Sequence, residues 1–298
     1  MKKAFAITVC DRVDYFRRMA ESLSKNNLQG YDIFFFVDAK GKPFVEQYHL
    51  ILKDAGIVNY IFDVAHTNLG CCGNIIRSRQ VLFDTYEYDF VVYSDDDVIL
   101  SKNFLTLNTN ILEWGLLNFD NIGTISLWSG GLNFSLEEKK TKNNLLYGGI
   151  NSSMTCALTR DCWNDISKDV IEFIRHNRVN IVSGDYLPVV YYMYDKFKTI
   201  LPDKVFARPL KLLNDFAANV ESMKDRLPAG QDMMFPIVLF KKGWSGLSVV
   251  VSRVENIGEI GEHTTTELWN GEFLYRNISL YEDDNEVNIN EFQIASKE

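Results

Sequence analysis

The stretch Asp89-Phe-Val-Val-Tyr-Ser-Asp-Asp-Asp-Val-Ile-Leu-Ser-Lys-Asn-Phe104 runs from apolar residues straight into three carboxylates. Residues 90–93 are β-branched or aromatic, which predicts a buried strand. Aspartate has low strand propensity, so Asp95, Asp96 and Asp97 are expected where this strand ends. The strand therefore delivers negative charge to one edge of a sheet.

Three adjacent aspartates repel one another, and a fold tolerates them only where water, cations or a metal offset that repulsion. Hard oxygen donors at the end of a strand suit Mg²⁺ or Mn²⁺, which keep several waters and often share their coordination with substrate phosphates. The simpler interpretation is a solvated acidic turn that caps a helix beginning near Ser101. What surrounds the triplet in the predicted fold decides between the two.

Composition places the chain among ordinary globular proteins. Its 298 residues are 46% hydrophobic and 24% charged, and that length is enough for one large domain or a domain and a half. The net charge of −9 argues against nucleic-acid binding, because phosphate contacts need clustered Lys and Arg. Five cysteines without a C-x-x-C pair predict free thiols in a reducing compartment. No run reaches the roughly 18 to 20 apolar residues of a membrane span, so we expect a soluble cytoplasmic protein with at most peripheral membrane contact.

The first hundred residues alternate strands with helices. Apolar runs predict strands at 4–9, 31–37, 57–62 and 90–93. Helical spacing of apolar residues predicts helices over about 13–23, 43–55 and 75–83, the second opened by Pro43. Four strands that alternate with three helices indicate a parallel, doubly wound α/β sheet.

Polar residues follow each of these four strands. They are Thr8 to Arg12, Asp38, His66 to Gly70, and Asp95 to Asp97. Parallel strands place their carboxyl ends on one edge of a sheet, where open α/β sheets bind ligands. The sequence therefore predicts a binding site along this rim.

The remainder of the chain is less regular. The expected elements are a helix over 101–119, a strand over 122–128, a polar loop over 129–149, a strand over 154–159, a helix over 162–174, an apolar helix or strand over 233–240 and a strand over 247–254. No linker separates two domains.

Three motifs resemble those of glycosyltransferases of the GT-A fold, which use nucleotide sugars. Ile7-Thr-Val-Cys-Asp-Arg-Val-Asp-Tyr-Phe-Arg-Arg-Met-Ala-Glu-Ser-Leu23 is similar to T-x-x-N-R-P-x-Y-L-x-R-x-L-x-S-L, with Asp11 for the usual Asn and Val13 for Pro. Residues 95–105 resemble the E-D-D-L-x-x-x-x-x-F-F segment of the N-acetylglucosaminyltransferase I type. Gly230-Gln-Asp-Met-Met234 and Asn256-Ile-Gly-Glu-Ile-Gly-Glu-His-Thr264 resemble the W-D-x-x-x and N-I-G-x-G-x-x-x-T-H-T ending of some bacterial nucleotide-diphospho-sugar transferases.

The resemblance implies a Rossmann-like GT-A catalytic domain over residues 1–264. Its nucleotide-binding half would be 1–100 and its acceptor-binding half 101–264, with an acidic extension over 265–298. The implied reaction moves a sugar from a nucleoside diphosphate sugar, by preference a UDP-sugar, to a hydroxyl of a glycan or related acceptor, with inversion.

The resemblance also implies a metal site. Asp97 would coordinate Mn²⁺ or Mg²⁺ between the two donor phosphates, where the ion neutralises the charge of the leaving group. Asp95 and His263 would be further ligands. Asp95 and Asp96 would also hold the ribose and the sugar, or orient metal-bound water.

Further donor-binding residues are implied along the rim: Thr8, Cys10, Asp11, Arg12, Asp38, Asn68 and Arg77. The first four would meet the base and ribose, Asp38 is the acid after the second strand, and Arg77 would reach phosphate or the base. Arg79 competes with Arg77 for this role. A helix rotates by about 100° per residue, so only one of the two arginines should face the rim.

Inverting transfer needs a carboxylate that accepts the proton of the attacking hydroxyl. The third motif implies Asp232 for this role, and Asp185 in Val-Ser-Gly-Asp-Tyr is the alternative. Either aspartate is also an ordinary turn or helix-cap residue.

Two other functions compete with sugar transfer. Asp95-Asp-Asp97 also resembles the D-x-D-x-[TV] motif of haloacid-dehalogenase-type phosphatases, although Ile99 replaces the required Thr or Val and that motif normally lies near the amino terminus. A non-catalytic nucleotide-sugar or glycan-binding protein on the same fold is the second alternative. A nucleotidyltransferase is disfavoured, because no Gly-rich phosphate loop follows the first strand.

Overall fold

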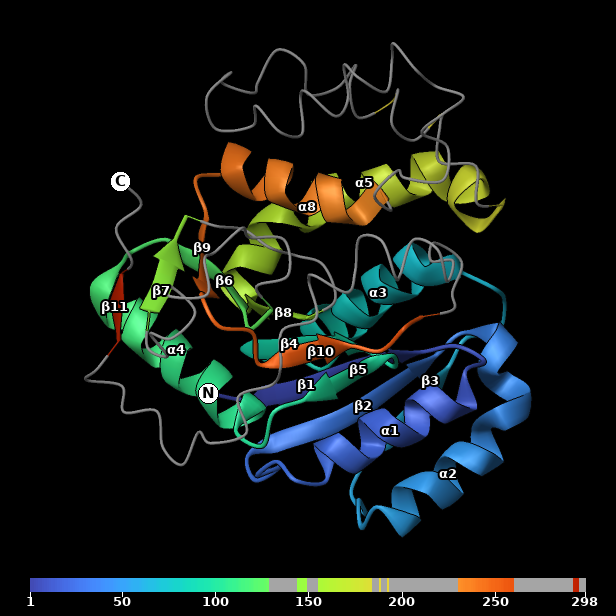
Figure 1. Ribbon diagram of the computed structural model, residues 1–298. Helices are drawn as coiled ribbons and strands as arrows, with labels where there is room; N and C mark the ends of the chain where they lie inside the picture. The colour runs from blue at the N-terminus through green and yellow to red at the C-terminus, as the bar shows by residue number, and fades with distance from the viewer. Residues whose placement is uncertain are drawn as a thin grey trace.

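The computed structural model describes residues 1–128, 144–148, 155–183, 188, 192, 230–259 and 292–294. Their strands form a nine-stranded mixed sheet, mostly parallel, in the order β11-β7-β9-β6-β8-β4-β1-β2-β3 (Figure 1). Helices flank this sheet, so the α/β class expected from the sequence is confirmed.

The amino-terminal half is a parallel unit whose strand order is β3-β2-β1-β4. Its elements are β1 Lys3–Val9, α1 Val13–Leu23, β2 Tyr31–Val37, the 3₁₀ helix η1 Ala39–Phe44, α2 Val45–Asp54, β3 Ile61–Val64, α3 Gly70–Gln80, the π-helical turn η2 Val81–Thr85 and β4 Phe90–Asp95. Central strands of a parallel sheet are covered on both faces, which explains their nearly continuous apolar runs. The strand and helix alternation predicted for residues 1–100 is confirmed.

The second half continues the sheet with mixed pairing. Its elements are β5 Val98–Leu100, α4 Phe104–Asn118, β6 Ile122–Ser126, β7 Asn144–Tyr147, β8 Thr155–Thr159, α5 Arg160–Ser183, α8 Gly230–Lys241, β9 Ser245–Val249, β10 Val254–Asn256 and β11 Gln293–Ile294. Strand β8 enters antiparallel between β4 and β6, and so joins the two halves into one sheet.

Two hydrophobic cores lie on opposite faces of the sheet. Phe5 and Ile7 of β1 pack with α1, α2 and α4 on one face, whereas Ala4 and Ala6 pack with α3, α5 and α8 on the other. This division follows the two-residue repeat of strand side chains. Figure 1 shows the same arrangement, with α1 and α2 below the sheet and α5 and α8 above it.

A small second sheet brings a distant segment to the acidic triplet. Strand β10 pairs antiparallel with β5, which follows Asp97 directly, and places Asn256 opposite Val98. Residues 254–256, distant in the sequence, therefore lie beside the end of β4.

Several predicted boundaries were wrong. The third strand is β3 at 61–64 rather than 57–62, the helix expected from Ser101 begins at Phe104, and β5 was missed. Pro43 lies inside η1, and α2 begins after it. Part of the loop expected at 129–149 is β7. The single strand expected at 247–254 is β9 and β10, which belong to different sheets because the chain turns between them.

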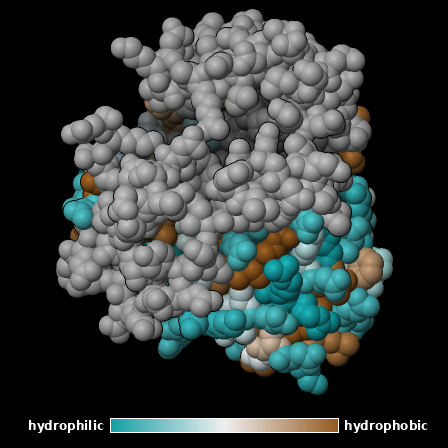
Figure 2. Space-filling model, in the orientation of Figure 1, coloured by the Kyte–Doolittle hydropathy of each residue, from teal (hydrophilic) through white to brown (hydrophobic). Residues whose placement is uncertain are grey.

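Helix α5 is longer than the expected 162–174, and residues 233–240 are helical in α8. Among the helices of the described ranges, none combines the length and apolarity that a bilayer span requires. In the view of Figure 2 the described surface is mostly hydrophilic, with a group of hydrophobic residues near the middle.

Candidate functional site

The parallel register of β1 and β4 sets Thr8 opposite Asp95 at the carboxyl end of both strands. The Thr8 hydroxyl donates a 2.6 Å hydrogen bond to Oδ1 of Asp95. Burial raises the pKa of Asp95 to about 7, and the charge of Asp97 adds to the shift. A cation bound next to such a carboxyl group would favour its charged form and lower its pKa.

Asp96 is buried, with only 1% of its surface exposed. The backbone N–H of Cys10 donates to its Oδ2 at 3.0 Å, and the Arg12 guanidinium forms an ion pair with its Oδ1. Burial raises the pKa of Asp96 and Arg12 opposes that shift. The interpretation of the triplet as a solvated acidic turn is therefore wrong, because its middle carboxylate anchors the loop after β1.

Asp97 is the more accessible of the two carboxylates that Arg12 binds. Its side chain is 16% exposed. Its Oδ2 accepts a 2.6 Å hydrogen bond from Nη1 of Arg12. Its backbone carbonyl accepts the N–H of Ile257 at 2.9 Å. Asp97 therefore sits between the loop after β1 and the segment that follows β10.

Arg12 joins two members of the triplet, since its guanidinium contacts both Asp96 and Asp97. Burial lowers the pKa of Arg12, but the neighbouring carboxylates outweigh burial and raise it above the ordinary value. The guanidinium carbon also lies 5.5 Å from the centre of the Tyr15 ring. In this structure Arg12 supplies the positive charge that lets adjacent aspartates coexist.

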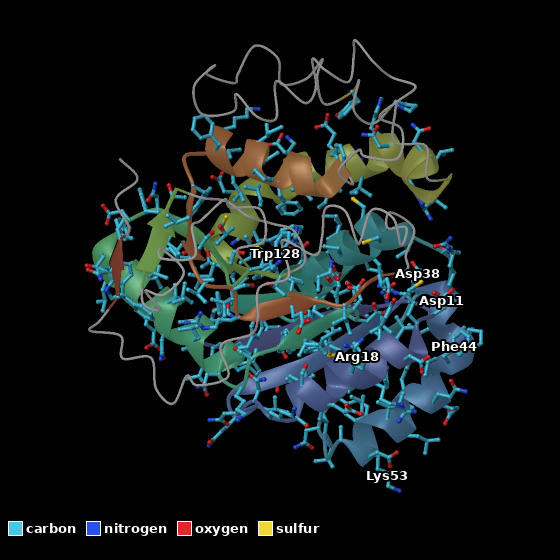
Figure 3. The ribbon with its side chains drawn as sticks, viewed as in Figure 1. Asp11, Arg18, Asp38, Phe44, Lys53 and Trp128 are labelled. Atoms are coloured by element: carbon cyan, nitrogen blue, oxygen red, sulfur yellow. The ribbon has the colours of Figure 1, made fainter. Side chains whose placement is uncertain are left out.

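Asp38 lies at the same end of the sheet as Asp11 (Figure 3). Its carboxylate accepts backbone N–H groups from Leu69 at 3.0 Å and Lys40 at 3.4 Å, and only 4% of its surface is exposed. Asp38 thus ties η1 to the loop before α3. Asp11 is exposed. Burial raises the pKa of the half-buried Cys10 thiol to about 12, which keeps that thiol protonated at neutral pH.

The two arginines of α3 point apart, as predicted. Arg77 donates to Asn74 at 3.2 Å and forms an ion pair with Asp63 at the end of β3. Arg79 is buried against the rings of Phe235 and Tyr93, and so belongs to the core. Arg77 is therefore the arginine on the rim side. Asp63, which follows the strand predicted at 57–62 and lies within β3, is a rim residue that was not predicted, although its place after that predicted strand was a signal.

The remaining predicted residues are only partly described. Asn68 accepts the N–H of Gly70 at 3.0 Å, which closes the turn before α3. Asp232 belongs to the first turn of α8, and its side chain lies outside the described part of the chain. Asp185 and His263 also lie outside the described residues.

The donor chemistry of the triplet fits a divalent cation that shares its ligands with a substrate. Among the described ranges, no group of three or more His, Cys, Asp and Glu side chains forms a metal cage. Mg²⁺ and Mn²⁺ at nucleotide sites need no such cage, because one or two carboxylates, waters and phosphates complete the shell. Asp97 and Asp95 are carboxylates of this kind at a sheet edge.

Neither a scan against models of known protein families nor a search of curated proteins finds a match. Solved structures show limited similarity. TarS from S. aureus, solved with UDP, matches 56% of this chain and 49% of its own length at 18% identity and a TM-score of 0.38. The same protein has been solved with UDP-GlcNAc, and matches at 17% identity and a TM-score of 0.37.

Glucosyl-3-phosphoglycerate synthase from Mycobacterium tuberculosis, solved with Mn²⁺, UDP and phosphoglyceric acid, is also similar to the chain. It matches 55% of this chain and 58% of its own length at 12% identity and a TM-score of 0.35. The chain therefore spans about half the length of these solved structures.

Proposed function

We propose that the chain is a metal-dependent glycosyltransferase that moves a sugar from a nucleoside diphosphate sugar, by preference a UDP-sugar, to a hydroxyl acceptor. One observation carries this proposal: Asp95, Asp96 and Asp97 lie at the carboxyl end of β4, beside the end of β1, where open α/β sheets bind ligands. The three carboxylates are held there by Thr8, Cys10 and Arg12. We expect the acceptor to be a glycan or a related molecule.

Several residues of the rim have a role in this proposal. Asp97 and Asp95 would hold Mn²⁺ or Mg²⁺, which when bound neutralises negative charge on the diphosphate leaving group. Asp96 holds the loop after β1 in place through Cys10 and Arg12. The ribose and base would lie along the ends of β1, β2 and β3, with Arg77 beside them. Asp232 would accept the proton of the acceptor hydroxyl as that oxygen bonds to the anomeric carbon and the bond from that carbon to the nucleoside diphosphate breaks on the opposite face. This single displacement inverts the anomeric centre.

Isothermal titration with UDP, GDP and dTDP, each with and without Mn²⁺, tests the donor site. TarS was solved with UDP, and glucosyl-3-phosphoglycerate synthase with UDP and Mn²⁺, so UDP and Mn²⁺ are practical first probes. We expect one nucleotide to bind more tightly with Mn²⁺, and Asp97→Ala to remove that gain. Asp120→Ala, at an exposed turn between α4 and β6, is the matched control and should bind as the wild type does. If no nucleotide binds with or without metal, the proposal is wrong and phosphatase activity should be assayed.

Asp232→Asn separates an enzyme from a binding protein on the same fold. The amide keeps the size of the carboxylate but cannot accept a proton from the acceptor. We expect this variant to bind nucleotide as the wild type does and to lose at least about 100-fold in turnover of a UDP-sugar. Unchanged turnover would exclude Asp232 as the base and leave Asp185 as the candidate.

A further inference from the structure

The turn Asn256-Ile-Gly258 lies against Asp97, although the two are far apart in the sequence. The β5–β10 ladder brings them together by pairing Asn256 with Val98, the residue that follows Asp97. The N–H of Ile257 then donates to the carbonyl oxygen of Asp97 at 2.9 Å. The backbone on both sides of this contact is therefore fixed by hydrogen bonds.

The turn is closed by a side chain of its own. Oδ1 of Asn256 accepts the N–H of Gly258 at 2.8 Å, and both residues are buried. Because the asparagine is also held in the ladder with β5, the position of Gly258 relative to Asp97 is set by two separate sets of hydrogen bonds.

Space, rather than backbone conformation, explains the glycine at position 258. Its φ lies outside the left-handed region, so any residue could adopt this backbone. A Cβ at this position, however, would approach Oδ2 of Asp97 more closely than the 3.0 Å that real Cβ atoms observe, and would lie 3.2 Å from Oδ1 of Asn256. Without a Cβ, Gly258 leaves space for the Asp97 carboxylate.

The same oxygen of Asp97 is the one that Arg12 contacts. Nη1 of Arg12 donates to Oδ2 at 2.6 Å, and a Cβ at Gly258 would crowd that same atom. A methyl group at position 258 would push the carboxylate out of this place. The aspartate side chain can rotate, so the displacement costs the fold little and moves mainly the carboxylate.

We propose that Gly258, held by Asn256, is a positioning residue that aims the Asp97 carboxylate at the metal-bound diphosphate of the donor. This inference rests on the proposed function and extends it, since it makes the segment after β10 part of the nucleotide site. Gly258 would take this role through its contact with Asp97, since it has no side chain of its own.

The test compares Gly258→Ala with Gly115→Ala. Gly115 of α4 is also buried and also has an ordinary φ, and a Cβ there would lie 2.7 Å from Cδ1 of Leu247 and close to no residue of the triplet. For both variants we would measure UDP affinity with and without Mn²⁺ by isothermal titration, and thermal unfolding. We expect Gly258→Ala to remain folded and to lose at least tenfold of the Mn²⁺-dependent gain in UDP affinity, as Asp97→Ala does. Gly115→Ala should keep that gain, whatever its effect on stability.

Each result has a definite meaning. If wild-type protein shows the Mn²⁺-dependent gain and Gly258→Ala keeps it, the inference is overturned and the proposed function stands. If the wild type shows no such gain, both are overturned. Should Gly258→Ala fail to fold, Asn256→Ala gives the second test: the loss of the hydrogen bond to Gly258 must then reduce the gain, and an unchanged gain overturns the inference.

Discussion

Arg12 pairs with two of the three adjacent carboxylates, and its positive charge offsets their mutual repulsion. Asp96 is buried and would otherwise hold an uncompensated charge, because its second partner is the neutral N–H of Cys10. Breaking a buried ion pair from one side is costly for this reason. The arginine that the sequence motif assigns to the donor site therefore also stabilises the fold before any ligand binds.

Replacing Arg12 with alanine should destabilise the protein by about 3 kcal/mol, at the lower end of what a broken buried pair costs, since the arginine is partly exposed. Arg18→Ala, at an exposed position of α1, the helix that follows Arg12 (Figure 3), should change stability by less than about 0.5 kcal/mol. Urea unfolding at pH 7 without metal measures both. Equal midpoints for the two variants would show that Asp96 does not depend on Arg12.

Among the elements, β4 is the point where the two halves of the sheet meet. Its parallel partner is β1 and its antiparallel partner is β8. At the start of β4, Asp89 accepts the backbone N–H of Lys2 at 2.7 Å and forms a 3.2 Å ion pair with Arg160 at the start of α5. The Asp89 carboxylate thus connects β4 to the residue before β1 and to the start of α5, at the end of the strands opposite the triplet.

The hydrogen bond from Lys2 lowers the pKa of Asp89, and Arg160 adds to that shift. A lowered folded-state pKa contributes stability above the unfolded pKa of about 3.9, which is lost as the pH falls through the folded-state value. Asp89→Asn should therefore be less stable than the wild type at pH 7, by under about 1 kcal/mol because the pair is solvent-exposed. The difference should shrink as the pH falls below about 3.9. Urea unfolding from pH 7 to pH 3 measures it, and a difference that is constant with pH would contradict the prediction.

For the whole molecule, the far edge of the sheet is completed by a segment close to the end of the sequence. Strand β11 pairs parallel with β7, and Phe292 packs edge-on against Trp114 of α4. Phe292 is 8% exposed and belongs to the core on the α4 face. Part of the region expected to be an acidic extension is therefore integrated into the fold.

Phe292→Ala should cost about 3 kcal/mol of unfolding free energy, because it removes a buried aromatic ring. Ile294→Ala, at a position of β11 with 40% of its surface exposed, two residues after Phe292, should cost less than about 0.5 kcal/mol. Thermal or urea unfolding compares the two. A Phe292→Ala variant as stable as Ile294→Ala would mean that this segment does not contribute to the core.

The amino-acid sequence by itself determined the local features of this protein. The apolar runs at 4–9, 31–37 and 90–93 specify strands, the helical spacing around Phe16 specifies α1, and the low strand propensity of aspartate puts the triplet at the end of β4. Parallel pairing then follows from the alternation of strands and helices. These features depend on residues that are neighbours in the chain.

Only the tertiary structure decided which contacts the polar residues at the rim make. That Asp96 is buried, that Arg12 pairs with it, and that Gly258 borders Asp97 all depend on contacts between distant segments. The chain turn that separates β9 from β10 has the same origin, because an apolar run does not say which sheet each part of it joins. Local propensity selects an element, whereas packing and the pairing of buried charges select its partners.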